Sequence, residues 1–366
     1  MYQDEIEAHV VSIALSKSAQ VQYAAGDVSQ RELLPFVNQI KSISAAYVGH
    51  RSGASLTSPI SSAQSAMAYA LYYTPINAAK VLRLIPLLDL NKPRLRVLDL
   101  GSGPGTAALA LLAASEIELD LSCVESSREM RGALEALVPS FPARGRLASL
   151  RTIDSLERIN AGEPPFDLCI AANVFAELTE DRRLAMLRGI IPKLSPDGEL
   201  LMIEPGQQAH TRALMQIRDL ITTHYKDLTP LFPCTRSDSC PMLRESETDW
   251  CHDTIEWKQP RLNRLLDKML GFNKHRIKYS AFLFKRGGQL LDGARVLTPP
   301  RKERAGTEAL VCGKDSYGVV RIAKGLRSQN TRALEKAKVF ERIVFSEPLA
   351  PGTITLGADC VIKLGT

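Results

Sequence analysis

The stretch that decides the fold is VLDLGSGPGT, residues 97–106. A short apolar run, RLRVLDL (94–100), leads into a turn with glycines at 101, 103 and 105, and a helix-forming run, GTAALALLAAS (105–115), follows. Glycines in such a turn permit positive φ angles and let a ligand approach the backbone closely. The N–H groups at the start of the helix then face the bound group. The pattern predicts a strand–turn–helix unit with a small-ligand site at the turn.

Two acidic residues stand where such a ligand would lie. Asp99 precedes the turn, and Glu125 stands 24 residues after Gly101, at the end of the next predicted strand, IELDLSCVE (117–125). A carboxylate at that place can accept both hydroxyls of a ribose. A dinucleotide fingerprint requires its third glycine five positions after the first, whereas here the separation is four. We expect a nucleoside-type ligand, with a tight turn that binds nothing as the alternative. The predicted binding residues are Asp99, Gly101, Gly103, Gly105 and Glu125.

Strands and helices alternate on both sides of this turn. FDLCIAANVF (166–175) and GELLMIEPG (198–206) resemble further strands, with a helical run, EDRRLAMLRGIIPKL (180–194), between them. Such alternation predicts an α/β fold with a parallel, doubly wound sheet. RIKYSAFLFKR (276–286) alternates like a half-exposed or edge strand. With Asp99 and Glu125, the turn resembles the first motifs of class I S-adenosylmethionine-dependent methyltransferases.

The rest of the chain extends this core at both ends. Residues 1–92 have apolar residues at helical spacing and predict a helical N-terminal region. We expect the methyltransferase-like domain to cover 93–290, with a cysteine-loop insertion at 231–258. Residues 291–366 hold short strand-like runs and predict a basic, β-rich C-terminal region.

Composition and charge narrow the class of protein. The chain has 366 residues, of which 45% are hydrophobic and 23% charged, which fits a globular protein. It contains no apolar run of about 18 residues, so we expect no membrane span. The acidic start, MYQDEIEAHV, is unlike a signal or transit peptide and predicts a cytoplasmic protein, with the mitochondrial matrix as the alternative.

The charge is distributed unevenly along the chain. Residues 258–342 carry 21 Lys and Arg against 7 Asp and Glu, whereas the remainder carries 25 against 33. A basic segment on an otherwise acidic protein predicts a polyanion-binding surface, most simply for nucleic acid, although a solvated basic face is the alternative. The residues expected to form this surface are Lys258, Arg261, Arg264, Lys274, Arg276, Arg301, Lys302, Arg304 and Arg321.

Three of the 7 cysteines are crowded into one polar stretch, CTRSDSCPMLRESETDWCH (234–252). The spacing of Cys234, Cys240 and Cys251 differs from that of a zinc ribbon, but clustered thiols in a reducing compartment favour a metal over disulfides. Four thiolates suit either zinc or an iron–sulfur cluster. Cys312, which lies 61 residues after Cys251, is the expected fourth ligand, and His252 is its rival. Unrelated free cysteines remain the alternative.

The order of these features resembles a methyltransferase-like family that assists assembly of the small ribosomal subunit, known from mitochondria and with bacterial relatives. The resemblance implies that Cys234, Cys240, Cys251 and Cys312 hold a 4Fe–4S cluster. It also implies binding of S-adenosylmethionine and of small-subunit rRNA or a subunit precursor, by a protein that is monomeric off the ribosome. An active rRNA methyltransferase with a structural four-cysteine zinc site is the alternative function. No catalytic residue is predicted, because the Asn/Asp-Pro-Pro-aromatic motif of amino-methylating enzymes is missing after 172.

Overall fold

The computed structural model describes residues 1–49, 59–314, 317–326, 332–346, 354–356, 360 and 362–364. The described chain forms two compact units. Unit 1 comprises Met1–Val174, Leu184–Ser195 and Ile255–Ile277, and unit 2 comprises Phe175–Arg183, Pro196–Thr254 and Lys278–Thr366. Among the described helices, none is long and apolar enough to cross a membrane.

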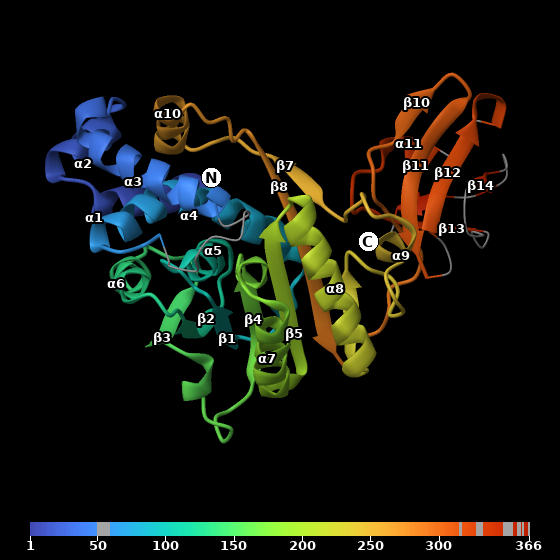
Figure 1. Ribbon diagram of the computed structural model, residues 1–366, viewed down its shortest axis with the longest axis horizontal. Coiled ribbons are helices and arrows are strands. Elements are labelled where there is room, and N and C mark those ends of the chain that lie inside the picture. The colour runs from blue at the N-terminus through green and yellow to red at the C-terminus, as the bar shows by residue number, and fades with distance from the viewer. Residues whose placement is uncertain are drawn as a thin grey trace. The chain divides into compact units, whose positions relative to one another are not determined.

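Unit 1 contains four strands in the order β3-β2-β1-β4, all running in parallel (Figure 1). In the register of these strands, Asp99 of β1 stands between Cys123 of β2 and Ile170 of β4. This places the carboxyl ends of the three strands side by side, where open α/β sheets bind ligands. The strands are β1 (Arg94–Leu100), β2 (Glu118–Val124), β3 (Arg146–Ile153) and β4 (Phe166–Ala172).

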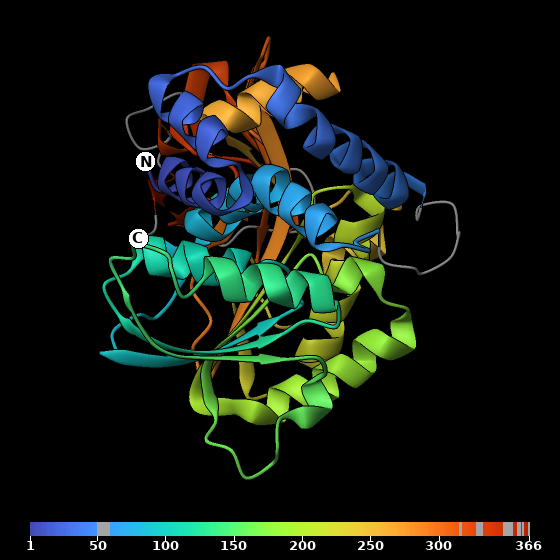
Figure 2. The same cartoon turned by 90° about the vertical axis from the view of Figure 1, so that its left-hand side faces the viewer.

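Helices supply the rest of unit 1. The long helix α4 packs against α1, α3, α5 and α6, and α10 packs against α1, α3 and α4 although it comes much later in the chain (Figure 2). The buried side chains of α5 surround the whole helix, as expected for a helix enclosed by protein on all sides. The helices are α1 (Tyr2–Ala14), α2 (Lys17–Ala25), α3 (Gln30–Gly49), α4 (Ala63–Leu84), α5 (Thr106–Ala114), α6 (Arg128–Leu137) and α10 (Arg261–Leu270).

Unit 2 contains a second group of strands, in which β8 pairs with β5 on one side and with β6 on the other, antiparallel in both cases. The α/β fold expected from the sequence is confirmed, but the expected parallel sheet is in fact mixed in direction. The prediction of a half-exposed or edge strand at 276–286 was wrong, because β8 has a neighbour on each side and six consecutive buried residues. These elements are β5 (Leu194–Pro205), α8 (Gln208–His224), β6 (Leu228–Phe232), α9 (Pro241–Glu245) and β8 (Arg276–Arg286).

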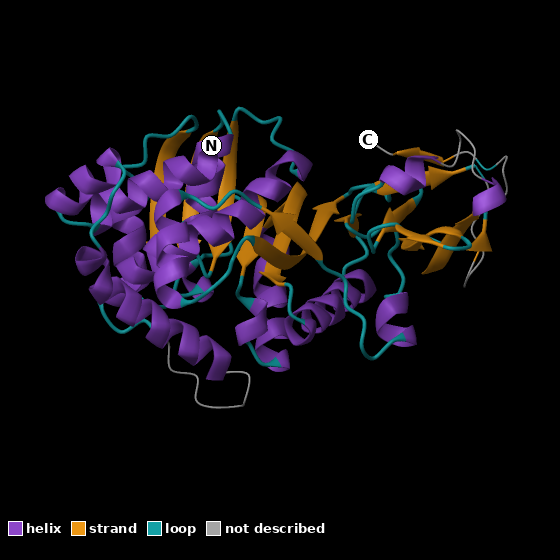
Figure 3. Cartoon of the chain, turned by 90° about the horizontal axis from the view of Figure 1, so that it is seen from above, coloured by secondary structure: helices purple, strands orange, loops and turns teal. Residues whose placement is uncertain are grey.

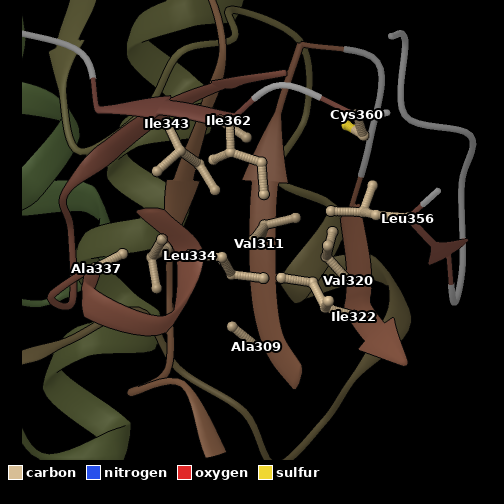
Figure 4. Close-up of a cluster of buried hydrophobic side chains, with 12 residues drawn as sticks. Ala309, Val311, Val320, Ile322, Leu334, Ala337, Ile343, Leu356, Cys360 and Ile362 are labelled. Carbon is tan, nitrogen blue, oxygen red and sulfur yellow. The ribbon is translucent and has the colours of Figure 1, made fainter. Parts of the chain in front are cut away.

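The C-terminal part of unit 2 forms its own sheet, in the order β14-β12-β11-β9-β13-β15 with β10 beside β11. Its core is aliphatic and includes Val311, Val320 and Ile343, each at most 1% exposed (Figure 4). Alternation of inward apolar and outward polar residues accounts for this one-sided core. The elements are β9 (Ala294–Val296), β10 (Arg301–Glu303), β11 (Gly306–Gly313), β12 (Tyr317–Ala323), α11 (Arg332–Lys336), β13 (Arg342–Phe345), β14 (Ile354–Thr355) and β15 (Ile362–Leu364).

Figure 3 colours the remaining helices, strands and turns by type. Helix α7 and strand β7 contain residues of both units, as β5 and β8 do at one end. Their bounds are α7 (Glu180–Ile190) and β7 (Asp253–Glu256), and single 3₁₀ turns occupy Ile85–Leu87, Leu156–Arg158, Phe175–Glu177, Ile191–Lys193 and Lys324–Leu326.

Candidate functional site

The glycine turn adopts the conformation that its sequence predicts. Gly101, Gly103 and Gly105 have φ angles of 59°, 53° and 86°, which other residues rarely adopt. A Cβ on Gly101 would lie 2.4 Å from Cγ2 of Val174, and one on Gly105 would lie 2.4 Å from Cγ2 of Val138. A Cβ on Gly103 would meet no described atom within 4 Å. Two of the glycines therefore allow close packing, whereas the middle one borders open space.

Asp99 is the buried acid of the turn. Its side chain is 2% exposed, and its Oδ2 atom has no hydrogen-bond partner among the described residues. Burial, together with the negative charge of Glu125, raises the pKa of Asp99 to about 8. An orphaned carboxylate oxygen of this kind is costly, and in native proteins it commonly marks a place where a ligand or water supplies the partner.

Glu125 closes the turn from the end of β2. Its Oε2 accepts a hydrogen bond from the Gly103 N–H at 3.0 Å, and its Oε1 accepts one from the Ser127 N–H at 2.8 Å. Ser127 in turn caps α6, because its side chain accepts from the N–H of Met130. The carboxylate expected to meet a ribose thus already holds both the glycine turn and the start of α6.

A third strand end contributes a pair that the sequence did not reveal. Lys80 of α4 is 5% exposed, and its Nζ donates to Oδ1 of Asn173 at 3.1 Å. Asn173 follows β4 and has a φ of 59°, a left-handed value that asparagine tolerates better than most residues. Nothing in the amphipathic pattern of α4 distinguishes Lys80 from an ordinary helix-surface lysine, so only the structure identifies this pair.

These features fit a nucleoside-type cofactor. The free space beside Gly103 gives room for a bound group, and Asp99 offers an oxygen that lacks a partner. Glu125 stands at the place from which a carboxylate can accept ribose hydroxyls. The five sequence-predicted residues lie together in unit 1, around the carboxyl ends of β1 and β2.

The four cysteines singled out by the sequence lie together in unit 2. Cys234 follows β6, Cys240 precedes α9, Cys251 precedes β7, and Cys312 lies in β11. Electrostatic interactions connect Cys251 with each of the other three, and Cys312 with both Cys234 and Cys240. Main-chain contacts help to fix two of them, since Asp219 accepts from the Cys240 N–H at 3.0 Å and the Cys251 carbonyl accepts from Ser280 at 2.9 Å.

Two arginines flank this cysteine cluster (Cys234, Cys240, Cys251 and Cys312), although no sequence pattern indicated them. Arg218 of α8 is fully buried and interacts with the Cys234 thiol, and Arg236 interacts with the Cys312 thiol. Both guanidinium groups are also anchored, because Arg218 donates to Asp219 at 2.7 Å and Arg236 donates to Asp238 at 2.6 Å. Positive surroundings of this kind stabilise thiolates over thiols.

The cluster is not arranged as a coordination sphere. Within the described ranges, no group of three or more His, Cys, Asp or Glu side chains is placed to hold a metal ion. Burial, with Cys234 nearby, raises the pKa of Cys312 to about 12, and burial raises the pKa of Cys251 well above its ordinary value. The rival ligand His252 stacks on Trp250 with 5.0 Å between ring centroids. The four thiols interact electrostatically with one another, and four thiolates are the ligand type that zinc or a 4Fe–4S cluster uses, but the described positions of the side chains do not form such a site.

The basic residues predicted to form one surface are divided between the two units. Lys258, Arg261, Arg264, Lys274 and Arg276 belong to unit 1, and the others belong to unit 2. In unit 1 all of them except the half-buried Arg261 are exposed. In unit 2, Arg301, Lys302 and Arg304 are exposed on β10 and the turn after it, whereas Arg321 is paired with Glu308 at 2.9 Å.

Comparison with solved structures gives several methyltransferases. The plantazolicin methyltransferase BpumL, in complex with SAH and a monoazolic desmethylPZN analog, matches with 14% identity and a TM-score of 0.36, covering 78% of this chain and 99% of that one. TehB from Haemophilus influenzae matches with 14% identity and a TM-score of 0.37, covering 60% and 65%. CrArsM, an arsenic (III) S-adenosylmethionine methyltransferase from Chlamydomonas reinhardtii, matches with 15% identity and a TM-score of 0.32, covering 57% and 67%.

Comparison with sequences and family models gives a more direct result. Among curated protein sequences no relative matches. A family model described as "Mitochondrial small ribosomal subunit Rsm22" matches residues 63–326. The matched range contains the glycine turn, Glu125 and all four residues of the cysteine cluster. Because it covers well over half of the chain, this protein belongs to the Rsm22 family of the small ribosomal subunit.

Proposed function

We propose that this chain is an S-adenosylmethionine-binding factor that assists assembly or translation by the small ribosomal subunit, carries a 4Fe–4S cluster and binds subunit rRNA. The observation that carries the proposal is the glycine turn, which combines free space at Gly103 with an orphaned oxygen on buried Asp99. Membership of a small-subunit family supplies the cellular context. The experiments below distinguish this proposal from the alternative expected from the sequence, an active rRNA methyltransferase with structural zinc.

Asp99, Gly101, Gly103, Gly105 and Glu125 are the residues that would hold the cofactor. S-Adenosylmethionine, when bound, supplies an electrophilic methyl group. The chain's own contribution is to place a backbone free of side chains beside the ligand and to offer the carboxyl groups of Asp99 and Glu125 to its polar groups. Glu125 already has its oxygens directed at backbone N–H groups, so it is held in position before any ligand arrives.

Cofactor binding can be tested with a pair of variants matched for backbone strain. Gly103→Asn and Gly271→Asn each place asparagine at a positive φ, 53° and 71°, and each added Cβ meets no described atom within 4 Å. Calorimetric titration with S-adenosylmethionine is expected to show binding by the wild type and by Gly271→Asn, with at least a tenfold loss in Gly103→Asn, because its side chain occupies the open space. Equal affinity in the two variants would contradict this assignment.

The cysteine cluster supports the metal part of the proposal through the donors beside it. The Arg218 and Arg236 guanidinium groups interact with the Cys234 and Cys312 thiols, and Asp219 and Asp238 hold these arginines in place. Positively charged donors of this kind favour the thiolate form that a metal centre requires. A bound cluster would link the segment 234–251 to β11. The entropic cost of closing that loop would be offset by the free energy of the metal–thiolate bonds.

The metal can be identified on protein purified without oxygen. A 4Fe–4S cluster is expected to give a brown protein with broad visible absorption and about four iron and four sulfide per chain. Cys312→Ser is expected to bleach this colour, whereas Cys169→Ala, which removes a buried thiol outside the cluster, is expected to retain it. A colourless protein with one zinc per chain would support the alternative function.

Binding to the ribosomal subunit is tested by co-sedimentation. The exposed cations of 258–276 and of β10 are suited to phosphate contacts, which position a protein on RNA without reading its sequence. The wild type is expected to co-migrate with small subunits or their precursors at low salt and to dissociate as salt rises. Migration apart from these particles at low salt would refute the proposal. Transfer of labelled methyl groups to rRNA, lost in Gly103→Asn, would identify an active methyltransferase.

A further inference from the structure

A cavity of about 360 Å³ lies in unit 1 where the end of α2 meets α10, and none of its lining residues belongs to the glycine turn or to the cysteine cluster. This volume is near the lower end of the range of about 300–1,000 Å³ that is typical of small-ligand sites. The cavity is lined on the α2 side by Tyr23, Gly26 and Asp27 and on the α10 side by Arg261, Arg264 and Lys268. It therefore has three cationic side chains against one acidic one.

The three cations share one face of α10, since they are separated by three and four positions. Like charges at this spacing destabilise a helix by a few tenths of a kcal/mol per pair. No ion pair joins Arg261, Arg264 or Lys268 to an acidic side chain in the described part of the chain. The pocket thus concentrates three positive charges, with Asp27 as the one acidic side chain in its lining.

Arg261 is held rigidly at the wall of the cavity. Its guanidinium lies over the ring of Tyr23, 5.6 Å from the ring centroid. A Cβ on Gly26 would come within 3.1 Å of its Nη2 atom, so the glycine leaves room for the guanidinium. Nη2 is buried and has no hydrogen-bond partner among the described residues. A buried donor without an acceptor is unfavourable, and an anionic oxygen would satisfy it.

The start of α10 is occupied by another group, so the cavity draws its positive charge from side chains. The buried carboxylate of Glu7 accepts the N–H groups of Leu262 and Asn263 at 2.8 and 2.7 Å, and it also accepts the Tyr23 hydroxyl at 3.0 Å. These bonds fix α10 against α1 and α2. The two exposed cations, Arg264 and Lys268, are therefore presented from a firmly anchored helix.

We propose that this cavity binds a phosphoryl group of the RNA backbone, with Arg264 and Lys268 contacting its oxygens and Arg261 Nη2 supplying a buried donor. The inference rests on the proposed function, because it takes the RNA to be that of the small subunit. The limited volume admits about one nucleotide unit, so the site fixes a single point of the chain and does not follow an extended groove. A free nucleotide has the same phosphoryl chemistry, and the experiment distinguishes the two sources.

The test uses the full-length protein and three double variants. Arg264→Gln/Lys268→Gln removes both exposed cations, and Arg264→Lys/Lys268→Arg keeps the charge. Arg182→Gln/Arg188→Gln removes two exposed cations of α7 and controls for net charge. Binding of a short single-stranded RNA and of small-subunit rRNA is measured by fluorescence anisotropy from low to high salt. AMP binding is measured separately by calorimetry.

Removing the pocket cations is expected to weaken RNA binding roughly tenfold at low salt, because charge-assisted hydrogen bonds are lost. The slope of log affinity against log salt is expected to become shallower by about 0.7, the value for one phosphate contact on a single strand. The charge-retaining variant should restore both values, and the α7 variant should keep the wild-type slope.

Each other outcome has a definite meaning. If the salt slope and the RNA affinity of the Arg264→Gln/Lys268→Gln protein were unchanged, the proposal that this pocket binds RNA would be wrong, and RNA would have to bind elsewhere on the chain. An equal loss of RNA affinity in the α7 variant would show that only net charge matters, and the proposal for the pocket would again be wrong. A wild type that binds no RNA would refute the proposed function. If AMP then bound to the wild type alone and not to the pocket variant, a free nucleotide would replace RNA as the source of the phosphoryl group.

Discussion

Replacing Asp99 with Asn should make the protein's stability less dependent on pH. Burial holds the pKa of Asp99 at about 8 in the folded protein, against an ordinary value of 3.8. Between these two values the folded state keeps the proton while the unfolded state has lost it. Rising pH therefore favours the unfolded chain, and the stability that Asp99 contributes at low pH is lost as pH rises through 8. Asparagine has nearly the same shape as the neutral acid and does not titrate.

The size of the effect follows from the width of this pH window. Over the three units from pH 5 to pH 8, linkage gives about 1.4 kcal/mol per unit, or ~4 kcal/mol in total. We expect the free energy of unfolding of Asp99→Asn to gain ~4 kcal/mol relative to the wild type over that range. Urea denaturation of both proteins at half-unit pH steps, monitored by circular dichroism, measures this difference directly, and the contributions of all other groups cancel.

Asp120→Asn provides the control. Its hydrogen bond from Arg94 lowers the pKa of Asp120, so that group is ionised in both states throughout the window and should add no slope. If the difference between Asp99→Asn and the wild type stayed constant within about 1 kcal/mol from pH 5 to pH 8, the raised pKa of Asp99 would be wrong.

Three further predictions concern packing and anchoring. Gly101→Ala should lower the free energy of unfolding by about 1–3 kcal/mol more than Gly103→Ala, because only the former meets Val174, at 2.4 Å; equal losses in thermal melts would contradict this. Glu7→Ala should lower the free energy of unfolding by about 1–2 kcal/mol, because it removes the acceptor of the N–H groups at the start of α10. Amide hydrogens at the start of α10 should then exchange faster, and unchanged protection would argue against the anchoring role of Glu7. Arg295→Ala should lower the free energy of unfolding by about 3 kcal/mol, since this buried arginine donates to three main-chain carbonyls. Limited proteolysis should then cleave the β-rich region faster, and an unaltered cleavage rate would refute the stabilising role of Arg295.

Much of the core of unit 1 could be anticipated because its signals are local. The apolar run 94–100 is β1 itself, and the helix-forming run after the glycine turn is α5, Thr106–Ala114. Residue periodicity and glycines act within a few residues, so the sequence displays them directly. The direction of β8 was not accessible in this way, since strand pairing depends on contacts between distant segments.

The candidate sites divide along the same line. Cysteine spacing identified the cysteine cluster, because cysteine is rare enough for crowding to stand out. Arg218 and Arg236 could not be found, since arginine is common and both reach the thiols only through the packing of α8 and the loop after β6. Lys80 and the pocket on α10 were missed for the same reason: their meaning depends on partners that lie far away in sequence.

The bonds of Glu125 bear on how this glycine motif is interpreted wherever it occurs. One carboxylate joins the turn to the start of α6 by accepting the N–H groups of Gly103 and Ser127, so the same acid serves folding as well as any cofactor. A lineage that stopped transferring methyl groups would still lose stability on replacing Glu125, and selection for a stable fold would preserve the motif. The presence of such a turn is therefore not evidence of catalysis by itself, because the need for a stable fold is enough to preserve it.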